Sequence, residues 1–166
     1  AEKNRSTLIR SIVWFLDKLE ENNSLKTVLS AEGKPLVELS FRFDSGIRTA
    51  SFDEQITLCG HGDEIAESED GAKFWLATKT TKHQLSAAFF AQFSPHNQFG
   101  LYDLAGKFVF NVPTQGLVLD ALQVGATFTR TARHFIPKTD MQRDEWLKDF
   151  SIIAKEMEQA AEDSYW

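Results

Sequence analysis

The stretch "LVELSFRFDSGIRTASF", residues 36–52, decides the fold class, because apolar and polar residues alternate along it. Successive side chains of a strand point to opposite faces, so this alternation predicts strands with one buried and one solvated face. A hairpin with a two-residue turn at 45–46 would place Leu39 opposite Phe52. The stretch therefore predicts paired antiparallel strands at the start of a sheet.

Two segments near the ends of the chain predict helices. Residues 6–22 follow a cap at Ser6, and Thr139 with Gln142 has the spacing of a capping box at the start of a last helix. Apolar residues recur at helical spacing in both segments, which predicts that both helices face the core. These residues are Leu8, Ile9, Ile12, Val13, Leu16 and Leu19 in the first segment and Trp146, Phe150, Ile153 and Met157 in the last.

The middle of the chain predicts further strands and two more helices. Residues 55–59 and 74–80 favour strands, residues 82–93 a short helix, and residues 98–112 a second hairpin turning at Gly106. Residues 117–136 fit a helix, although 126–136 fit a strand as well. The predicted fold class is α+β, an antiparallel sheet of about five to six strands with an N-terminal helix, a mid-chain helix and C-terminal helices. We expect a single domain over residues 1–166.

Composition narrows the classes of function. The formal net charge of −6 disfavours nucleic acid as a partner. The single cysteine suits a reducing compartment, no secretory leader is recognised, and no apolar run has the length of a membrane span. These features predict a cytoplasmic protein without membrane contact.

The stretch "ITLCGHGDEIAE", residues 56–67, gathers Cys59, His61 and Asp63 and is the part of the chain most suggestive of chemistry. A zinc or nucleophile site needs several converging donors, and neither a second cysteine nor a suitably spaced histidine pair completes a set. We therefore expect no metal, no cofactor and no catalytic residue. A small metal-dependent enzyme using these three residues stays as an alternative.

Both faces of the predicted second hairpin are apolar, so something must cover each of them. Tyr102, Phe108 and Phe110 share one face and are the predicted interface with a protein partner, a peptide or a second copy of the chain. The leading hypothesis is thus a non-enzymatic protein-binding module, chaperone-like or adaptor-like, that forms a homodimer.

Charged residues suggest two further sites. Lys79 and Lys82, with Arg130 and Arg133, form a candidate anion-binding set, although such charges are more often a solvated face. The acidic run at residues 63–70 supports an alternative function, an immunity or antitoxin protein that binds a basic toxin.

The stretch "LSAAFFAQFSPHNQFGLYDLAGKFVFNV", Leu85 to Val112, resembles the region where type III secretion chaperones and bacterial sensory-transduction-regulator domains place a helix, an Asn-containing loop and a hairpin with a Gly turn. The order of the predicted elements along most of the chain is also similar to these families. The resemblance implies a dimeric, non-enzymatic protein of the bacterial cytoplasm that holds another polypeptide against an apolar surface.

Overall fold

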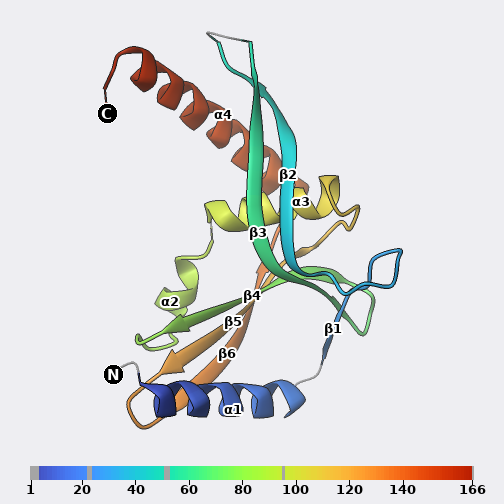
Figure 1. Ribbon diagram of the computed structural model, residues 1–166, viewed down its shortest axis with the longest axis vertical. Helices are drawn as coiled ribbons and strands as arrows, with labels where there is room; N and C mark the ends of the chain where they lie inside the picture. The colour runs from blue at the N-terminus through green and yellow to red at the C-terminus, as the bar shows by residue number, and fades with distance from the viewer. Residues whose placement is uncertain (1–3, 22–23, 51–52, 95, 166) are drawn as a thin grey trace.

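The computed structural model describes residues 4–21, 24–50, 53–94 and 96–165, and their helices and strands surround one mixed sheet (Figure 1). In chain order the elements are α1 (Arg5–Glu21), β1 (Leu25–Thr27), β2 (Val37–Arg48), β3 (Gln55–Ser68), β4 (Lys73–Thr81), α2 (Ala87–Ala91), α3 (Asn97–Phe108), β5 (Gly116–Val124), β6 (Thr129–Pro137) and α4 (Asp140–Glu162). The α+β class predicted from the sequence is confirmed.

The sheet is mixed, so the prediction of a purely antiparallel sheet is wrong. Its strand order is β1-β3-β4-β5-β6, and β2 pairs with β3 beside this path. β4 and β5 run parallel, whereas the other pairs are antiparallel. Parallel neighbours need a long crossover, and here α2 and α3 carry the chain back to the starting end of the sheet.

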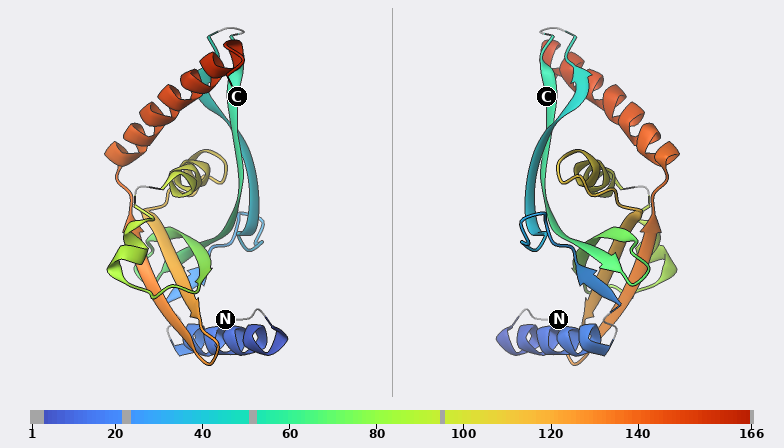
Figure 2. Two further views of the ribbon diagram at one scale, coloured as in Figure 1. Left: turned by 90° about the vertical axis from the view of Figure 1, so that its left-hand side faces the viewer. Right: turned by 90° about the vertical axis from the view of Figure 1, so that its right-hand side faces the viewer.

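The sheet curls into a half-barrel with α3 on its concave side (Figure 2). β3 pairs with β4 only from Glu64 to Glu67, and with β2 from Gln55 to Glu64. The part of β3 before Glu64 therefore pairs with β2 alone, and these two strands leave the sheet together as a long two-stranded arm (Figure 1). α1 lies across the lower end of the sheet, far from α4 (Figure 2).

The core lies between the sheet and α3. Trp75 on β4 and Leu119 on β5 are fully buried, and Tyr102 on α3 is 3% exposed. The Trp75 and Tyr102 rings lie 5.0 Å apart between centroids. A Cβ atom on Gly62 would lie 2.4 Å from the Trp75 ring, so glycine allows the indole to lie against β3.

The predicted second hairpin at residues 98–112 is wrong, because Asn97–Phe108 form helix α3. This helix is buried over most of its circumference, including Phe99, Tyr102 and Leu104, so apolar residues occur on every side. Such a sequence lacks the one-sided pattern of a surface helix and fits a strand covered on both faces equally well.

The predicted helix at residues 117–136 is also wrong, whereas the strand alternative for 126–136 agrees with β6. All residues of β5 from Gly116 to Gln123 are buried. A strand inside a mixed sheet is covered on both faces and reads as a continuous apolar run, which periodicity does not separate from a buried helix.

The first hairpin differs from its prediction in register. β2 continues through Gly46 to Arg48 and pairs with β3, so the turn lies beyond Arg48. Phe52, the predicted partner of Leu39, lies outside the described residues. β3 is also longer than the predicted strand 55–59, and it includes most of the acidic run at 63–70.

The predicted helices near the two chain ends both form, but the predicted core-facing stripe of α4 is wrong in part, because Ile153 and Met157 are 44% and 59% exposed. The capping box of Thr139 and Gln142 begins α4, as predicted. α1 begins at Arg5, but its predicted core-facing stripe is wrong, since Thr7 and Ser11 are its buried residues. The mid-chain helix is shorter than predicted and covers only Ala87–Ala91.

Candidate functional site

A chain of polar contacts lies where β3 and β4 separate beside α3. Lys79 Nζ donates to Gln98 Oε1 at 3.4 Å, and Gln98 Nε2 donates to the Tyr102 hydroxyl at 2.6 Å. The Tyr102 hydroxyl donates in turn to the His61 carbonyl oxygen at 2.7 Å. Strand β4 supplies the lysine, and successive turns of α3 supply the glutamine and tyrosine.

Asp63 places a carboxylate next to these groups. Its Oδ2 atom accepts a hydrogen bond from the Thr78 backbone N–H at 3.0 Å, just beyond the last β3–β4 pair, Glu64 with Leu76. Within the described ranges, neither Asp63 nor Lys79 takes part in an ion pair. We refer to Asp63, Lys79, Gln98 and Tyr102 as the Lys79 cluster.

The electrostatics of the cluster favour a protonated tyrosine and a neutral histidine. Burial raises the pKa of Tyr102, and the Asp63 charge raises it further. Burial lowers the pKa of His96, and the positive charges of Lys79 and Lys138 add to this effect. Tyr102 therefore remains a hydrogen-bond donor, and the two lysines create a positive potential around His96.

The start of α3 adds to this positive potential. His96 is the N-cap of α3, and its side chain makes no capping hydrogen bond. Its Nδ1 atom is buried and has no hydrogen-bond partner among the described residues. Helix N-termini favour negative charge, because their first backbone N–H groups lack acceptors. Three features thus favour an anion on the Lys79 side of α3: this helix end, Lys79 and Lys138.

A surface pocket of about 570 Å³ extends from Lys79 over α2. Its lining includes His83, Phe89 and Phe93, so it combines a cation with aromatic surface. A ligand held by Lys79 has room to continue along this pocket.

The four predicted anion-binding residues do not form one site. Lys79 belongs to the cluster, and Lys82 is exposed nearby. Arg133 donates two hydrogen bonds of 2.7 Å to Asp120, whose side chain is 6% exposed. The Arg130 guanidinium lies 5.0 Å from the centre of the Phe128 ring, near the β5–β6 turn. Only the lysine half of the predicted set lies near the cluster.

Cys59, His61 and Asp63 also do not converge through their side chains. His61 bonds Glu38 at 2.7 Å through Nε2 and Ser40 at 3.0 Å through Nδ1, on the exposed face of the arm. Cys59 is exposed. No group of three or more histidine, cysteine or acidic side chains in the described parts of the chain could hold a metal ion.

The predicted interface residues lie in different environments. Tyr102 is buried in the chain's own core, and the Phe110 ring lies 6.0 Å from that of Trp75. Phe108 is 61% exposed and lies beside Phe43, which pairs with Leu58 partway along the arm. These three residues do not share one exposed face, because they lie on a helix and the loop after it.

Sequence reasoning did not single out Gln98, and it assigned Asp63 and Tyr102 to other sites, a possible metal or toxin site and a protein interface. Gln98 and Tyr102 are four residues apart, which is the spacing of neighbours on one helix face. This spacing has no such meaning in a strand, which is what the pattern of the segment predicts. Other acids of the 63–70 run have partners in the same chain: Glu64 accepts from Thr27 at 2.7 Å, and Glu67 lies 3.7 Å from Lys73.

Comparisons with known proteins leave the chain without a family. No family model matches it, and no curated protein matches it. A solved structure described as "Crystal structure of SSO0001" aligns with a TM-score of 0.41 and 11% identity, covering 86% of this chain. The chain spans 56% of the length of that solved chain. A similarity at this level carries no argument about function.

None of the helices among the described residues is both long enough and apolar enough to cross a bilayer.

Proposed function

We propose that this chain binds a phosphate-bearing ligand at the Lys79 cluster. The observation that carries the proposal is that a lysine and an aspartate lie beside the same helix without neutralising each other. Lys79 and Asp63 lie on the side of α3 that carries Gln98 and Tyr102. Neither of the two forms an ion pair within the described residues. Both side chains are half-buried, and charged groups form stronger hydrogen bonds than neutral ones, so a ligand that supplies a counterpart to each is favoured.

The cluster defines the chemistry of this ligand. A lysine ammonium binds a phosphate as a point charge, and the start of α3 reinforces the same sign. The Asp63 carboxylate is an acceptor, so the ligand should also carry a hydroxyl or amino group close to its phosphate. The acidic chain as a whole disfavours long polyanions, which favours a small phosphate ester.

Calorimetric titration with inorganic phosphate and with a nucleoside monophosphate tests this proposal. We expect Lys79→Met to abolish binding of both probes. Lys82→Met is the matched control, because Lys82 is exposed nearby and makes no described contact with the cluster. Asp63→Asn should weaken binding of the nucleotide more than that of phosphate. Equal losses in the two lysine variants, or no binding of either probe to the parent protein, would contradict the proposal.

We propose protein binding as a second function, as the sequence suggested. The observation that supports it is now the exposed apolar surface of α1. Leu8, Ile9 and Leu16 on this helix are 61%, 50% and 56% exposed. Clustered apolar side chains of this size typically mark an interaction surface. A cytoplasmic, chaperone-like or adaptor-like role is part of this proposal, and the exposed Cys59 suits a reducing compartment.

Anisotropy of a labelled amphipathic peptide measures this second function. Leu16→Asp should abolish peptide binding. Ile152→Asp on α4 is the control, because Ile152 has the same 56% exposure but lies on another helix. If both substitutions act equally, binding reflects general apolarity and no α1 site exists.

A further inference from the structure

The outward face of α1 is complementary to a second, antiparallel copy of itself in both charge and apolar character. Residues three or four positions apart lie on one helix face, and this face carries a basic residue, an apolar middle and an acidic residue. In order along the helix these residues are Arg5, Ile9, Ile12, Val13, Leu16 and Glu20.

We propose that two copies of the chain associate through this face, with the two α1 helices antiparallel. The inference rests on the proposed protein-binding role and names the partner, a second copy. The interface would be symmetric, so each residue pair occurs twice.

Contacts on the other side of α1 fix which face points outward. Ser11 Oγ lies 3.1 Å from Thr129 Oγ1 on β6, and Arg10 donates to the Gly125 carbonyl oxygen at 2.7 Å. Thr7 and Ser11 are buried against the sheet. The opposite face therefore points away from the molecule, where Ile12 and Val13 are 49% and 48% exposed.

An antiparallel arrangement pairs these residues with suitable partners. With Ile12 of one copy beside Val13 of the other, Ile9 meets Leu16 and Arg5 meets Glu20. Apolar residues then contact apolar residues in the middle, and opposite charges meet at both ends. A parallel arrangement would instead place Arg5 against Arg5 and Glu20 against Glu20.

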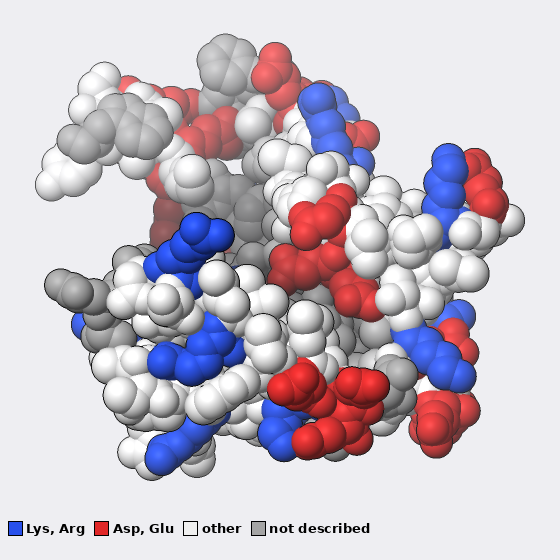
Figure 3. All heavy atoms as spheres, turned by 60° about the horizontal axis from the view of Figure 1, so that its bottom comes forward, with Lys and Arg blue, Asp and Glu red and all other residues white. Residues whose placement is uncertain are grey.

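The charges at the ends of α1 support the same partner. The first turn of α1 has no acidic residue, and Arg5 and Glu20 both oppose the helix dipole. They therefore weaken an isolated helix slightly. Beside an antiparallel copy, each lies near an opposite charge and near the opposite end of a second dipole. Viewed from the lower end of the molecule, the side chains on the left are mostly basic, whereas acidic side chains gather at the lower centre and on the right, where basic side chains also lie (Figure 3).

Sedimentation velocity over a range of protein concentrations tests the dimer, and a charge exchange tests its orientation. The parent protein should dimerise reversibly, and Val13→Asp should abolish the dimer. Arg5→Glu and Glu20→Arg should each weaken it, because each places like charges at both ends. The double variant Arg5→Glu/Glu20→Arg should recover the parent's dimerisation constant, since the pairs are restored with reversed sign.

Cysteine cross-linking in a Cys59→Ser background provides an independent test. Val13→Cys lies near the two-fold axis and should form an intermolecular disulfide. Arg5→Cys should not, because the two copies of residue 5 are about 22 Å apart along antiparallel helices with a rise of 1.5 Å per residue. Efficient cross-linking at both positions would show a parallel arrangement and overturn the proposal.

The outcomes separate this inference from the protein-binding role. A parent that stays monomeric at high concentration overturns the dimer, and if Leu16→Asp still abolishes peptide binding, the α1 site binds other proteins. A dimer that survives Val13→Asp uses another surface and also overturns the inference. Failure of the double variant to recover dimerisation overturns the antiparallel pairing.

Discussion

β5 and α1 are both rich in apolar residues, but they use them in opposite ways. Every residue of β5 from Gly116 to Gln123 is buried between β4, β6 and the elements that cover the sheet. In α1 the buried residues are Thr7 and Ser11, while the leucines and isoleucines of its outer face are exposed. Apolar content thus shows that a segment needs cover, and only the packing shows whether the same chain supplies it.

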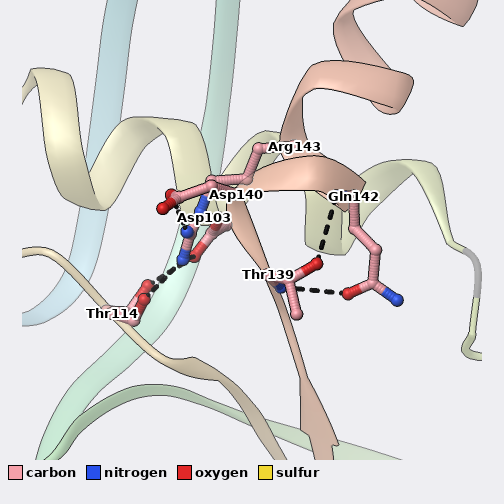
Figure 4. Close-up of polar contacts among 6 residues, drawn as sticks. All are labelled: Asp103, Thr114, Thr139, Asp140, Gln142 and Arg143. Atoms are coloured by element: carbon pink, nitrogen blue, oxygen red, sulfur yellow. Dashed lines mark hydrogen bonds and ion pairs between the residues drawn. The ribbon is translucent and has the colours of Figure 1, made fainter.

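Substitution at the α3–α4 contact should cause the largest loss of stability, because a buried ion pair joins the two helices (Figure 4). Asp103 is 3% exposed, and Arg143 binds its carboxylate while also donating to the Thr114 carbonyl oxygen at 2.7 Å. Arg143→Ala leaves a buried carboxylate without its cation and should lower the free energy of unfolding by about 3–5 kcal/mol.

Urea denaturation measures this loss. Asp140→Ala is the control, since Asp140 pairs with the same arginine but its side chain is 88% exposed. That substitution should cost at most about 1 kcal/mol. Equal losses of stability in the two variants would mean that the buried pair of Arg143 with Asp103 contributes no more than an exposed ion pair.

A matched pair of leucine substitutions tests the comparison of β5 with α1 directly. Leu119 is fully buried and Leu16 is 56% exposed. Leu119→Ala should destabilise the fold by about 2–5 kcal/mol through lost burial and a cavity. Leu16→Ala should change the stability of the monomer by less than about 0.5 kcal/mol. Thermal unfolding at low protein concentration distinguishes them, and similar shifts in melting temperature would break the comparison.

Gly62 tests how tightly the core is packed in comparison with the exposed face of α1, because its side of β3 has no room for a methyl group. Gly62→Ala places a Cβ atom 2.4 Å from the Trp75 ring and should cost about 1–3 kcal/mol. Trp75→Phe removes part of that ring. The double variant should therefore lose less than the sum of the two single losses in a denaturation cycle. Additive losses would show that the indole does not limit residue 62.

The smallest effect should be the pH dependence due to His96. Burial and the charges of Lys79 and Lys138 lower its pKa below the ordinary value of 6.5. The unfolded chain therefore binds a proton more readily than the folded one. Stability from His96 is present above pH 6.5 and is lost as the pH falls through the lower, folded pKa.

An NMR titration of His96 checks this sign, and Lys79→Met should raise its pKa. Unfolding measurements at several pH values should show a smaller loss on acidification in His96→Gln than in the parent protein. A folded-state pKa at or above 6.5 would contradict the prediction.

The sequence predicted the α+β class, the strand at 74–80 and the capping box at Thr139, because local patterns decide these features. It failed at α3 and β5, where burial on all sides removes periodicity. It also placed the apolar face of α1 in the core, since an amphipathic pattern shows that a face needs cover but not what covers it.

Only Lys79 was predicted as an anion-binding residue of the candidate site, whereas Asp63 was predicted as a possible metal ligand or toxin contact and Tyr102 as an interface residue. Asp63 lies on β3, whereas Gln98 and Tyr102 lie on α3. These residues meet because the crossover between two parallel strands returns α3 to the concave side of the sheet. Correct prediction of that crossover was needed before their contact could be inferred.

The open half-barrel has a further consequence, for solubility during folding. β6 ends the strand order of the sheet, so its outer edge presents backbone hydrogen-bonding groups that have no partner strand in the described fold. Such an edge can recruit strands from other molecules and start aggregation. β6 carries Arg130, which forms no ion pair within the described residues, and ends at Pro137, which lacks a backbone N–H group. Like charges and a missing donor both oppose the stacking of one edge on another, so the open sheet is protected while it folds.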